Sequence, residues 1–319
     1  MSARLIYQHS FRNCEQFSQA MAARRQTTVT QISLQSFRCD LLLVEFDHIQ
    51  VAYCTKLSVP VRVIGGKGHD SLEFAFILQT GQQELFSHRF AVPQGTIFGF
   101  DPTREVNLIV PENTHFCVVQ IQQPAFELCT QIMERTDLDA HFLKTNYVCR
   151  SDRSLGVHAY LKELYCLATH HASFLKSPES ERILFEDFLP QLVDALPPFP
   201  SRSRQALCIP RRFDLVEQAN EYMHANLQKS FTLMDLCKAL NTSKRPLNYG
   251  FQEVFGISPM AYLKALRLRS VRRQLQTADP TTTVIANVAH QYGFWSLGHF
   301  SRDYKTMFGE LPSETLKQG

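Results

Sequence analysis

The sequence predicts an α+β protein whose β-rich N-terminal part precedes an all-α C-terminal part. Three observations predict this order. Residues 1–125 hold short segments rich in β-branched and aromatic residues, residues 197–204 form a break rich in Pro, Ser and Arg, and one helical pattern occurs twice after residue 230. We therefore expect two domains, 1–196 and 211–319, joined by a linker at 197–210.

The N-terminal part is expected to hold nine strands, because each segment is short, β-prone and bounded by Gly, Pro or Asn. These strands are Thr30–Phe37, Leu41–Phe46, Gln50–Leu57, Val61–Ile64, Leu72–Gln79, Glu84–Phe90, Thr96–Phe100, Glu105–Val110 and Phe116–Ile121. Many short strands at this spacing are typical of a β-sandwich or a β-barrel.

Three helices are expected behind the strands, at Pro124–Arg135, Leu155–Phe174 and Glu179–Leu196. The last of them has an apolar stripe at helical spacing, formed by Ile183, Phe185, Phe188, Leu192 and Leu196. Such a stripe packs either on the β-domain or across a dimer interface, and the pattern does not choose between the two.

The linker is expected at 197–210 because its prolines cannot continue a helix and favour an extended chain. The charge balance changes sign across it. Residues 1–200 hold 17 basic and 21 acidic side chains, a net charge of −4, whereas residues 211–319 hold 14 and 9, a net charge of +5. An acidic front and a basic back indicate that only the back meets a polyanion.

Composition excludes several protein classes. The longest apolar run, Leu41–Val44, is far shorter than the ~20 residues of a membrane span, and the N-terminus has no signal-peptide core. The nine scattered cysteines form no C-x-x-C pair and predict neither a disulfide framework nor a zinc site. We expect a cytoplasmic protein without a membrane segment.

Two copies of one pattern occupy the C-terminal part. Leu236, Cys237, Leu240 and Asn241 recur 52 residues later as Val288, Ala289, Tyr292 and Gly293. The order Ser, apolar, aromatic, Phe-Gly and Pro then recurs at an offset of 53, from 243–259 to 296–312. Each copy predicts a helix–turn–helix, at about 232–255 and 284–308, with Thr232, Ser243 and Ser296 as N-caps and Asn241 and Gly293 in left-handed turns.

The second helix of each copy is predicted to leave a polar or basic face outward. That face carries Lys244, Arg245, Asn248, Tyr249 and Gln252 in the first copy, and His299, Ser301, Arg302 and Lys305 in the second. Arg can pair with guanine and Asn with adenine, while Lys and Ser can hold phosphates. One such helix alone is more often a solvated face, but two of them on a repeated helix–turn–helix favour DNA recognition.

A long basic helix is expected between the copies, at Ser258–Gln276. Along one side it carries Lys264, Arg267, Arg269, Arg272 and Arg273. At 1.5 Å per residue it spans about 28 Å, close to the ~34 Å of one DNA turn, so it can place two recognition helices in successive major grooves. Its basic side chains bind either DNA phosphates or structural carboxylates, and the sequence does not decide between these two roles.

Residues 212–316 resemble the DNA-binding domain of the AraC/XylS family of bacterial transcription regulators. The matching stretches are Thr232–Cys237, Phe251–Pro259, and Gly293-Phe294-Trp295 through Phe308 to Ser313. Arg267-Leu268, Val271-Arg272-Arg273, Gly293-Phe294-Trp295 and Asp303-Tyr304-Lys305 are similar to the ethanolamine-operon regulator subgroup. The resemblance implies base contacts at Arg245, Asn248 and Tyr249, and at Leu297, Gly298, His299 and Arg302.

The sequence departs from the family pattern in both recognition helices. Pro246 removes an amide that Ser243 could otherwise cap, and Gly250 weakens the middle of the first helix by ~1 kcal/mol relative to Ala. Leu297 and Gly298 leave the second helix without polar readers at its start, although Leu297 can contact a thymine methyl group.

The resemblance also implies that residues 1–150 form a cupin-like β-barrel sensor, often ligand-binding, which dimerises through the helices behind it. No metal or other cofactor is expected, because no His-x-His occurs, His48, His69, His88 and His115 stand singly, and His170-His171 point in different directions on a helix. No catalysis is expected either, since G-x-S-x-G is absent and Cys129 and Cys166 lie in helical core patterns.

We therefore expect a sequence-specific DNA-binding transcription regulator controlled by a small effector of unknown identity in the N-terminal domain. Its partners would be double-stranded DNA, a second copy in a homodimer, and RNA polymerase if it activates. The alternative is a metal-dependent cupin enzyme tethered to a DNA-binding domain.

Overall fold

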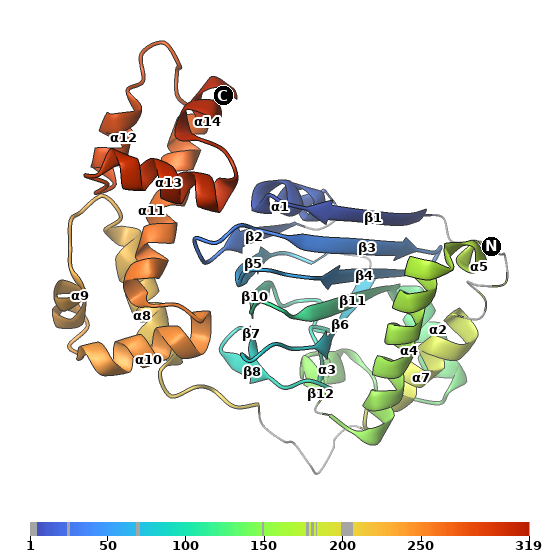
Figure 1. Ribbon diagram of the computed structural model, residues 1–319. Helices are drawn as coiled ribbons and strands as arrows, with labels where there is room; N and C mark the ends of the chain where they lie inside the picture. The colour runs from blue at the N-terminus through green and yellow to red at the C-terminus, as the bar shows by residue number, and fades with distance from the viewer. Residues whose placement is uncertain are drawn as a thin grey trace.

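The computed structural model describes residues 5–23, 26–67, 71–148, 150–176, 179, 182, 184–198 and 207–318. A β-rich N-terminal part and a helical C-terminal part lie side by side, as the sequence predicts (Figure 1). Most of the expected linker, residues 199–206, lies outside the described residues.

The N-terminal strands form two antiparallel sheets. The seven-stranded sheet has the order β1-β3-β4-β11-β6-β9-β12, and the five-stranded sheet has the order β2-β5-β10-β7-β8. The strands of the first are β1 (Leu5–Phe11), β3 (Cys39–Glu45), β4 (Ile49–Thr55), β6 (Ser71–Gln79), β9 (Ile97–Phe98), β11 (His115–Gln122) and β12 (Tyr147–Val148). Those of the second are β2 (Thr27–Gln31), β5 (Val61–Gly65), β7 (Leu85–Ser87), β8 (Phe90–Val92) and β10 (Val106–Val110).

The described strands form two facing sheets and do not close into a single barrel. The two sheets face each other across a shared core of buried side chains, but no ladder joins their edges in the described ranges. The spacing of short strands does not distinguish a barrel from two facing sheets, because both alternate inward and outward residues in the same way.

Two elements before residue 27 were not predicted from the sequence. Strand β1 is an edge strand with mostly exposed or half-exposed side chains, so it lacks a clear apolar pattern. Helix α1 (Cys14–Ala22) begins at Asn13, whose side-chain oxygen accepts hydrogen bonds from the amides of Glu15 and Gln16 at 2.8 and 3.3 Å. Asn at this position is a favoured N-cap, and this signal could have found the helix.

Helices cover the outer face of the seven-stranded sheet. They are α2 (Gln123–Ile132), α4 (Asp152–His170) and α7 (Leu189–Ala195), with the shorter α3 (Ala140–Leu143), α5 (Ala172–Leu175) and the π-helix η1 (Leu184–Phe188) nearby. Phe188, Leu192 and Leu196 of the predicted stripe are fully buried in the core that these helices share with the sheet. The stripe therefore packs on the β-domain; Ile183 and the side chain of Phe185 lie outside the described residues.

The C-terminal part consists of helices around two small cores. The helices are α8 (Phe213–Ala225), α9 (Leu233–Ala239), α10 (Lys244–Phe255), α11 (Pro259–Gln276), α12 (Ile285–Gln291), α13 (Leu297–Phe308) and α14 (Pro312–Gln318). Leu263 and Leu266 of α11 belong to the first core, while Leu268 and Leu275 belong to the second. Helix α11 is thus the common element of both halves.

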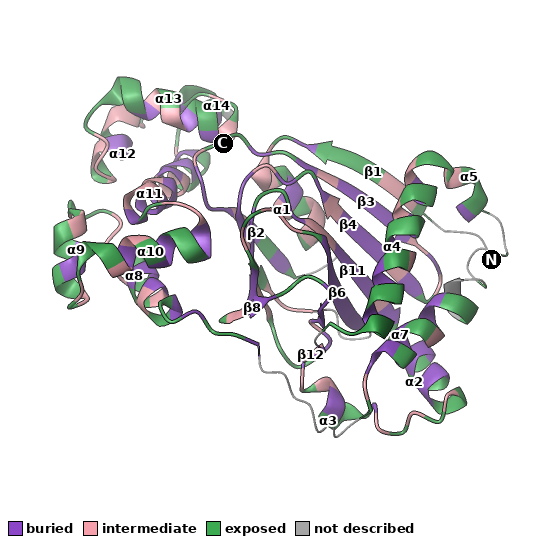
Figure 2. Ribbon diagram, turned by 60° about the horizontal axis from the view of Figure 1, so that its bottom comes forward, coloured by how far each residue is buried: buried purple, intermediate pink, exposed green. Residues whose placement is uncertain are grey.

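The helical part packs against the outer face of the five-stranded sheet. Ile32, Phe86, Ala91 and Ile109 are buried in one cluster with Phe213 and Val216 of α8. In Figure 2, helices α8, α10 and α11 each carry buried (purple) and exposed (green) segments. Ion pairs rim this contact, including Arg62–Glu217 at 3.3 Å and Arg89–Asp214 at 2.6 Å.

Candidate nucleic-acid interface

The first helix–turn–helix consists of α9 and α10. Thr232 and Asp235 form a reciprocal capping box at the start of α9, and Asn241 takes a left-handed φ of 49° in the turn. Helix α10 begins after Ser243 and ends at Gly256, which has a φ of 71°. The predicted Thr232 cap and the left-handed turn residue Asn241 are therefore confirmed. Ser243 and Ser296 occupy the N-cap positions of α10 and α13, but neither makes the predicted side-chain cap hydrogen bond.

The second helix–turn–helix, α12 and α13, repeats this geometry. Gly293 takes a φ of 79° in the turn, and Gly309 ends α13 with a φ of 80°. Left-handed residues occupy the same places in both copies because glycine, and more rarely asparagine, adopt this conformation at low cost. The sequence repeat is thus a structural repeat.

The predicted reading residues of α10 face outward, with one exception. Lys244, Arg245, Tyr249 and Gln252 are exposed, whereas Asn248 is half-buried. The Asn248 amide donates to the Lys244 carbonyl at 2.9 Å. The guanidinium groups of Arg245 and Arg212 each lie 5.6 Å from the Tyr249 ring centre, so two cations flank this ring.

Helix α13 also presents its predicted residues to the surface. Leu297, Gly298, His299, Arg302 and Lys305 are exposed, and Ser301 is half-buried. Trp295, in the turn before the helix, is 71% exposed and stacks on His290 of α12 with ring centres 5.4 Å apart. We did not predict this indole as a site residue, although it is the only tryptophan of the chain.

Three comparisons concern this helical domain. Residues 236–318 match the family described as a helix-turn-helix domain. Over 103 residues the chain is 35% identical to the probable thc operon regulatory protein of Rhodococcus erythropolis, covering 32% of this chain and 31% of that protein. Over 102 residues it is 37% identical to XylDLEGF operon transcriptional activator 2 of Pseudomonas putida, covering 31% and 64%.

A solved structure extends this comparison. The crystal structure of a probable AraC family transcriptional regulator from Rhodopseudomonas palustris shares 40% identity, with a TM-score of 0.31, over 33% of this chain and 96% of that one. The C-terminal domain belongs to the AraC/XylS family. The chain spans about a third of the length of the Rhodococcus relative and less than two thirds of the Pseudomonas one.

Within this AraC/XylS domain, four of the five basic residues of α11 have structural partners. Arg267 donates to the carbonyls of Leu227 and Lys229 at 3.0 and 2.6 Å, and Lys264 pairs with Asp303. Arg269 donates to the carbonyl of Gln31 at 2.6 Å, across the domain boundary.

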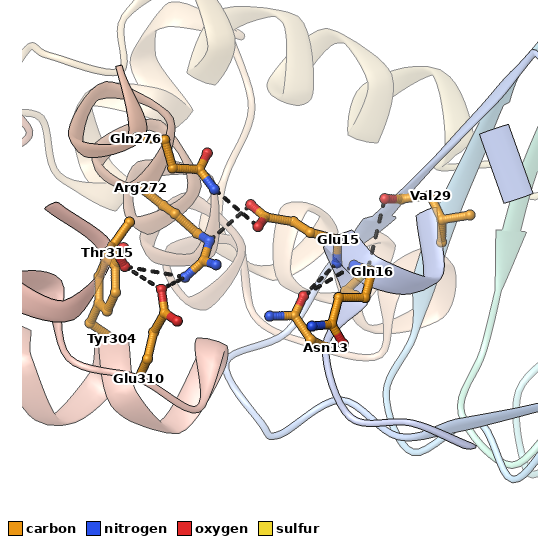
Figure 3. A network of polar contacts seen from close by, with 10 residues as sticks. Asn13, Glu15, Gln16, Val29, Arg272, Gln276, Tyr304, Glu310 and Thr315 are labelled. Carbon is orange, nitrogen blue, oxygen red and sulfur yellow. Dashed lines mark hydrogen bonds and ion pairs between the residues drawn. The ribbon is translucent and has the colours of Figure 1, made fainter. Parts of the chain in front are cut away.

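Arg272 is the most deeply buried of these cations, at 5% exposure. It lies between Glu15 of α1 and Glu310, at 2.9 and 2.7 Å (Figure 3). Of the four α11 arginines only Arg273 is exposed. Lys264, Arg267, Arg269 and Arg272 therefore bind structural partners within the protein, which was one of the two alternatives left open by the sequence.

The departures from the family pattern have visible consequences. Ser243 makes no side-chain cap hydrogen bond, as expected when Pro246 removes the amide it could have bound. Gly250 has a packing role that the sequence did not indicate. A Cβ atom there would lie 2.8 Å from Cγ2 of Val216 and 3.1 Å from Cβ of Arg212, so glycine lets α8 and α10 approach closely.

The N-terminal domain contains a cavity between its two sheets. Its empty volume is about 950 Å³ including the mouth, and its walls come from both sheets and from α1. Among the described residues, no three His, Cys, Asp or Glu side chains are grouped to hold a metal ion. No described helix is both long and apolar enough to cross a membrane.

Proposed function

We propose that this protein is a sequence-specific DNA-binding transcription regulator whose two helix–turn–helix motifs read successive major grooves. The observation that carries the proposal is the attachment of both motifs to α11, with α10 and α13 exposing corresponding faces. Helix α11 has 18 residues and is about 27 Å long, close to the ~34 Å between successive major grooves on one side of DNA.

The exposed residues divide into two roles. Arg245 and Tyr249 on α10, and His299 and Arg302 on α13, are proposed to contact base edges. Lys244, Asn248, Gln252, Gly298, Ser301 and Lys305 complete the proposed DNA interface, mainly through phosphates. Leu297 and Trp295 offer apolar contact to thymine methyl groups at the start of α13.

The N-terminal part, residues 1–196, is proposed to be a cupin-like sensor whose effector occupies the cavity between the sheets, with 197–210 as the linker. A homodimer is proposed through the outer faces of α2 and α4. Leu128, Ile132, Leu155 and Leu167 are 39–72% exposed there, and exposed apolar patches commonly mark protein interfaces. The protein would act in the cytoplasm and contact RNA polymerase if it activates.

DNA binding tests the proposal directly. The full chain should retard DNA recovered by binding-site selection, with an affinity that falls steeply between 50 and 200 mM salt because phosphate contacts release counterions. Residues 1–196, which lack both motifs, provide the control and should not retard this DNA. Equal retardation by that fragment would contradict the proposed division of labour.

A further inference from the structure

We propose that the cavity between the two sheets binds an elongated, mainly apolar and uncharged molecule with a polar group at each end. This inference rests on the proposed function, because it names the chemical class of the effector. It is carried by the shape of the cavity, by two unpartnered hydroxyl groups and by the charges in its wall.

The cavity extends along β10. Val106, Leu108 and Val110 all line it, and the ends of this strand lie about 14 Å apart at the usual rise per residue. The surrounding wall is mainly apolar and includes Phe17, Met21, Val29, Leu57, Phe98 and Phe116. An apolar body of matching length gains free energy from every methylene group that leaves water.

A buried threonine without a hydrogen-bond partner lies toward each end of the cavity. Thr27 and Thr114 both line it, are 3% and 1% exposed, and their hydroxyl groups have no partner among the described residues. Thr27 pairs with Gly65, which also pairs with Val106, whereas Thr114 follows the turn after Val110. A polar group at each end of a ligand would supply the two missing hydrogen bonds.

The charges in the wall disfavour an anion. Lys67, Glu73 and Glu105 line the cavity, so its described lining holds one cation and two carboxylates. Lys67 donates to the carbonyls of Gly99 and Asp101, both at 2.6 Å. Burial, with the charge of Arg104, lowers the pKa of His88 and so favours the uncharged form of this ring.

A carboxylate in the cavity would therefore add a like charge beside two others. An ammonium group would be attracted by the two wall carboxylates, but it would lose its hydration among mainly apolar walls. An alcohol, amide or carbonyl group carries no charge and loses much less hydration free energy on burial than an ion does. The walls thus select an uncharged ligand with terminal hydrogen-bonding groups.

Three chain-matched probes test this selection by calorimetric titration of the full chain: octane-1,8-diol, octanoate and octylamine. The diol is expected to bind at least tenfold more tightly than either charged probe. Tighter binding of octanoate or octylamine would overturn the uncharged class. Absence of binding by the diol to the folded protein would overturn the site.

Isosteric variants then test the two hydroxyl groups. Thr27→Val and Thr114→Val should each lower the affinity for the diol about fivefold, because each removes one hydrogen bond to it. Thr96→Val is the matched control, since Thr96 is equally buried and unpartnered but does not line the cavity. Its affinity for the diol should stay at the wild-type value, and equal losses in all three variants would contradict direct contact.

None of the variants is expected to lose stability, because valine keeps the volume and removes an unpaired hydroxyl; unfolding curves without probe check this. DNA retardation without probe tests the proposed function separately. A protein that binds its selected DNA but not the diol would contradict only the ligand class.

Discussion

Glu15 of α1 accepts a hydrogen bond from Nε of Arg272 on α11 at 2.9 Å, across the boundary between the two domains. Its second oxygen accepts from the Gln276 amide at 3.1 Å. Phe17 and Met21 of the same short helix line the cavity. Figure 3 shows the contact of Glu15 with α11. Helix α1 therefore contacts both the proposed effector site and the helix that carries both DNA-reading motifs.

This double contact makes α1 the route by which a cavity ligand is expected to alter DNA binding. Octane-1,8-diol should change the affinity of the wild-type chain for its selected DNA about fivefold or more, a usual size for coupling between sites. In Glu15→Gln the change should be at least threefold smaller. Gln16→Ala, an exposed neighbour on α1, serves as control. Equal diol effects in all three proteins would exclude this route.

Arg272→Ala should destabilise the protein far more than Glu15→Gln. Removal of the arginine leaves the half-buried Glu310 without its cation and also removes a ring contact, with the guanidinium 4.7 Å from the Phe308 ring centre. We expect a loss of about 2–3 kcal/mol, against less than about 1 kcal/mol for the more exposed Glu15. Denaturant unfolding of the full chain measures both, and equal losses would contradict this assignment.

Two helix glycines form a natural pair for a stability test. Gly250→Ala should destabilise the protein by about 1–3 kcal/mol despite the better helix propensity of alanine, because the new Cβ would clash with Val216. Gly298→Ala should stabilise it by about 0.5–1 kcal/mol, since no atom lies within 4 Å of the new Cβ. Thermal unfolding separates the two, and a stabilised Gly250→Ala would show that α8 moves aside freely.

Stability should fall as the pH drops below about 6.5, in part through His158. This ring is 5% exposed, and its Nδ1 donates to the Ser154 carbonyl at 2.6 Å. Burial lowers the pKa of His158 below its usual 6.5, so the unfolded chain binds the proton more readily and stability is lost toward acid pH.

The contribution of His158 amounts to at most about 1.4 kcal/mol per pH unit between its unfolded and folded pKa values. The variant His158→Gln should show a shallower dependence of unfolding free energy between pH 6.5 and 5. An unchanged slope would mean that other groups dominate, among them His88, His115 and His224, whose pKa values burial also lowers.

The sequence predicted the elements whose local signals agree with their surroundings. The repeated Ser, Phe-Gly and Pro positions predicted both motifs and the left-handed residues Asn241 and Gly293, because capping and turn geometry are local. Strand β1 escaped prediction because an edge strand lacks a clear apolar pattern. The predicted strand Glu84–Phe90 divides into β7 and β8 at His88, because this residue takes a left-handed φ of 58° within an otherwise β-prone segment.

Contacts between distant segments could not be predicted at all. In the sequence, Arg269 and Arg272 indicate a basic helix face. In the structure their partners are Gln31 and Glu15, which lie more than 230 residues away in the chain. The role of Gly250 likewise depends on Val216 of another helix. Residue type sets which partners are possible, but only the packing of the domains decides between a phosphate and a carboxylate.

Binding-site selection on four proteins tests the central claim most directly: wild type, Arg245→Ala, Arg302→Ala and Arg273→Ala. The wild type should select two half-sites whose centres lie about 10 base pairs apart. Arg245→Ala should relax the base preference in one half-site and Arg302→Ala in the other, each losing about 1–3 kcal/mol on the selected site. Arg273 is exposed on α11, so Arg273→Ala should weaken binding to all DNA sequences alike. Unchanged base preference in both Arg245→Ala and Arg302→Ala would contradict the claim that these two helices read DNA.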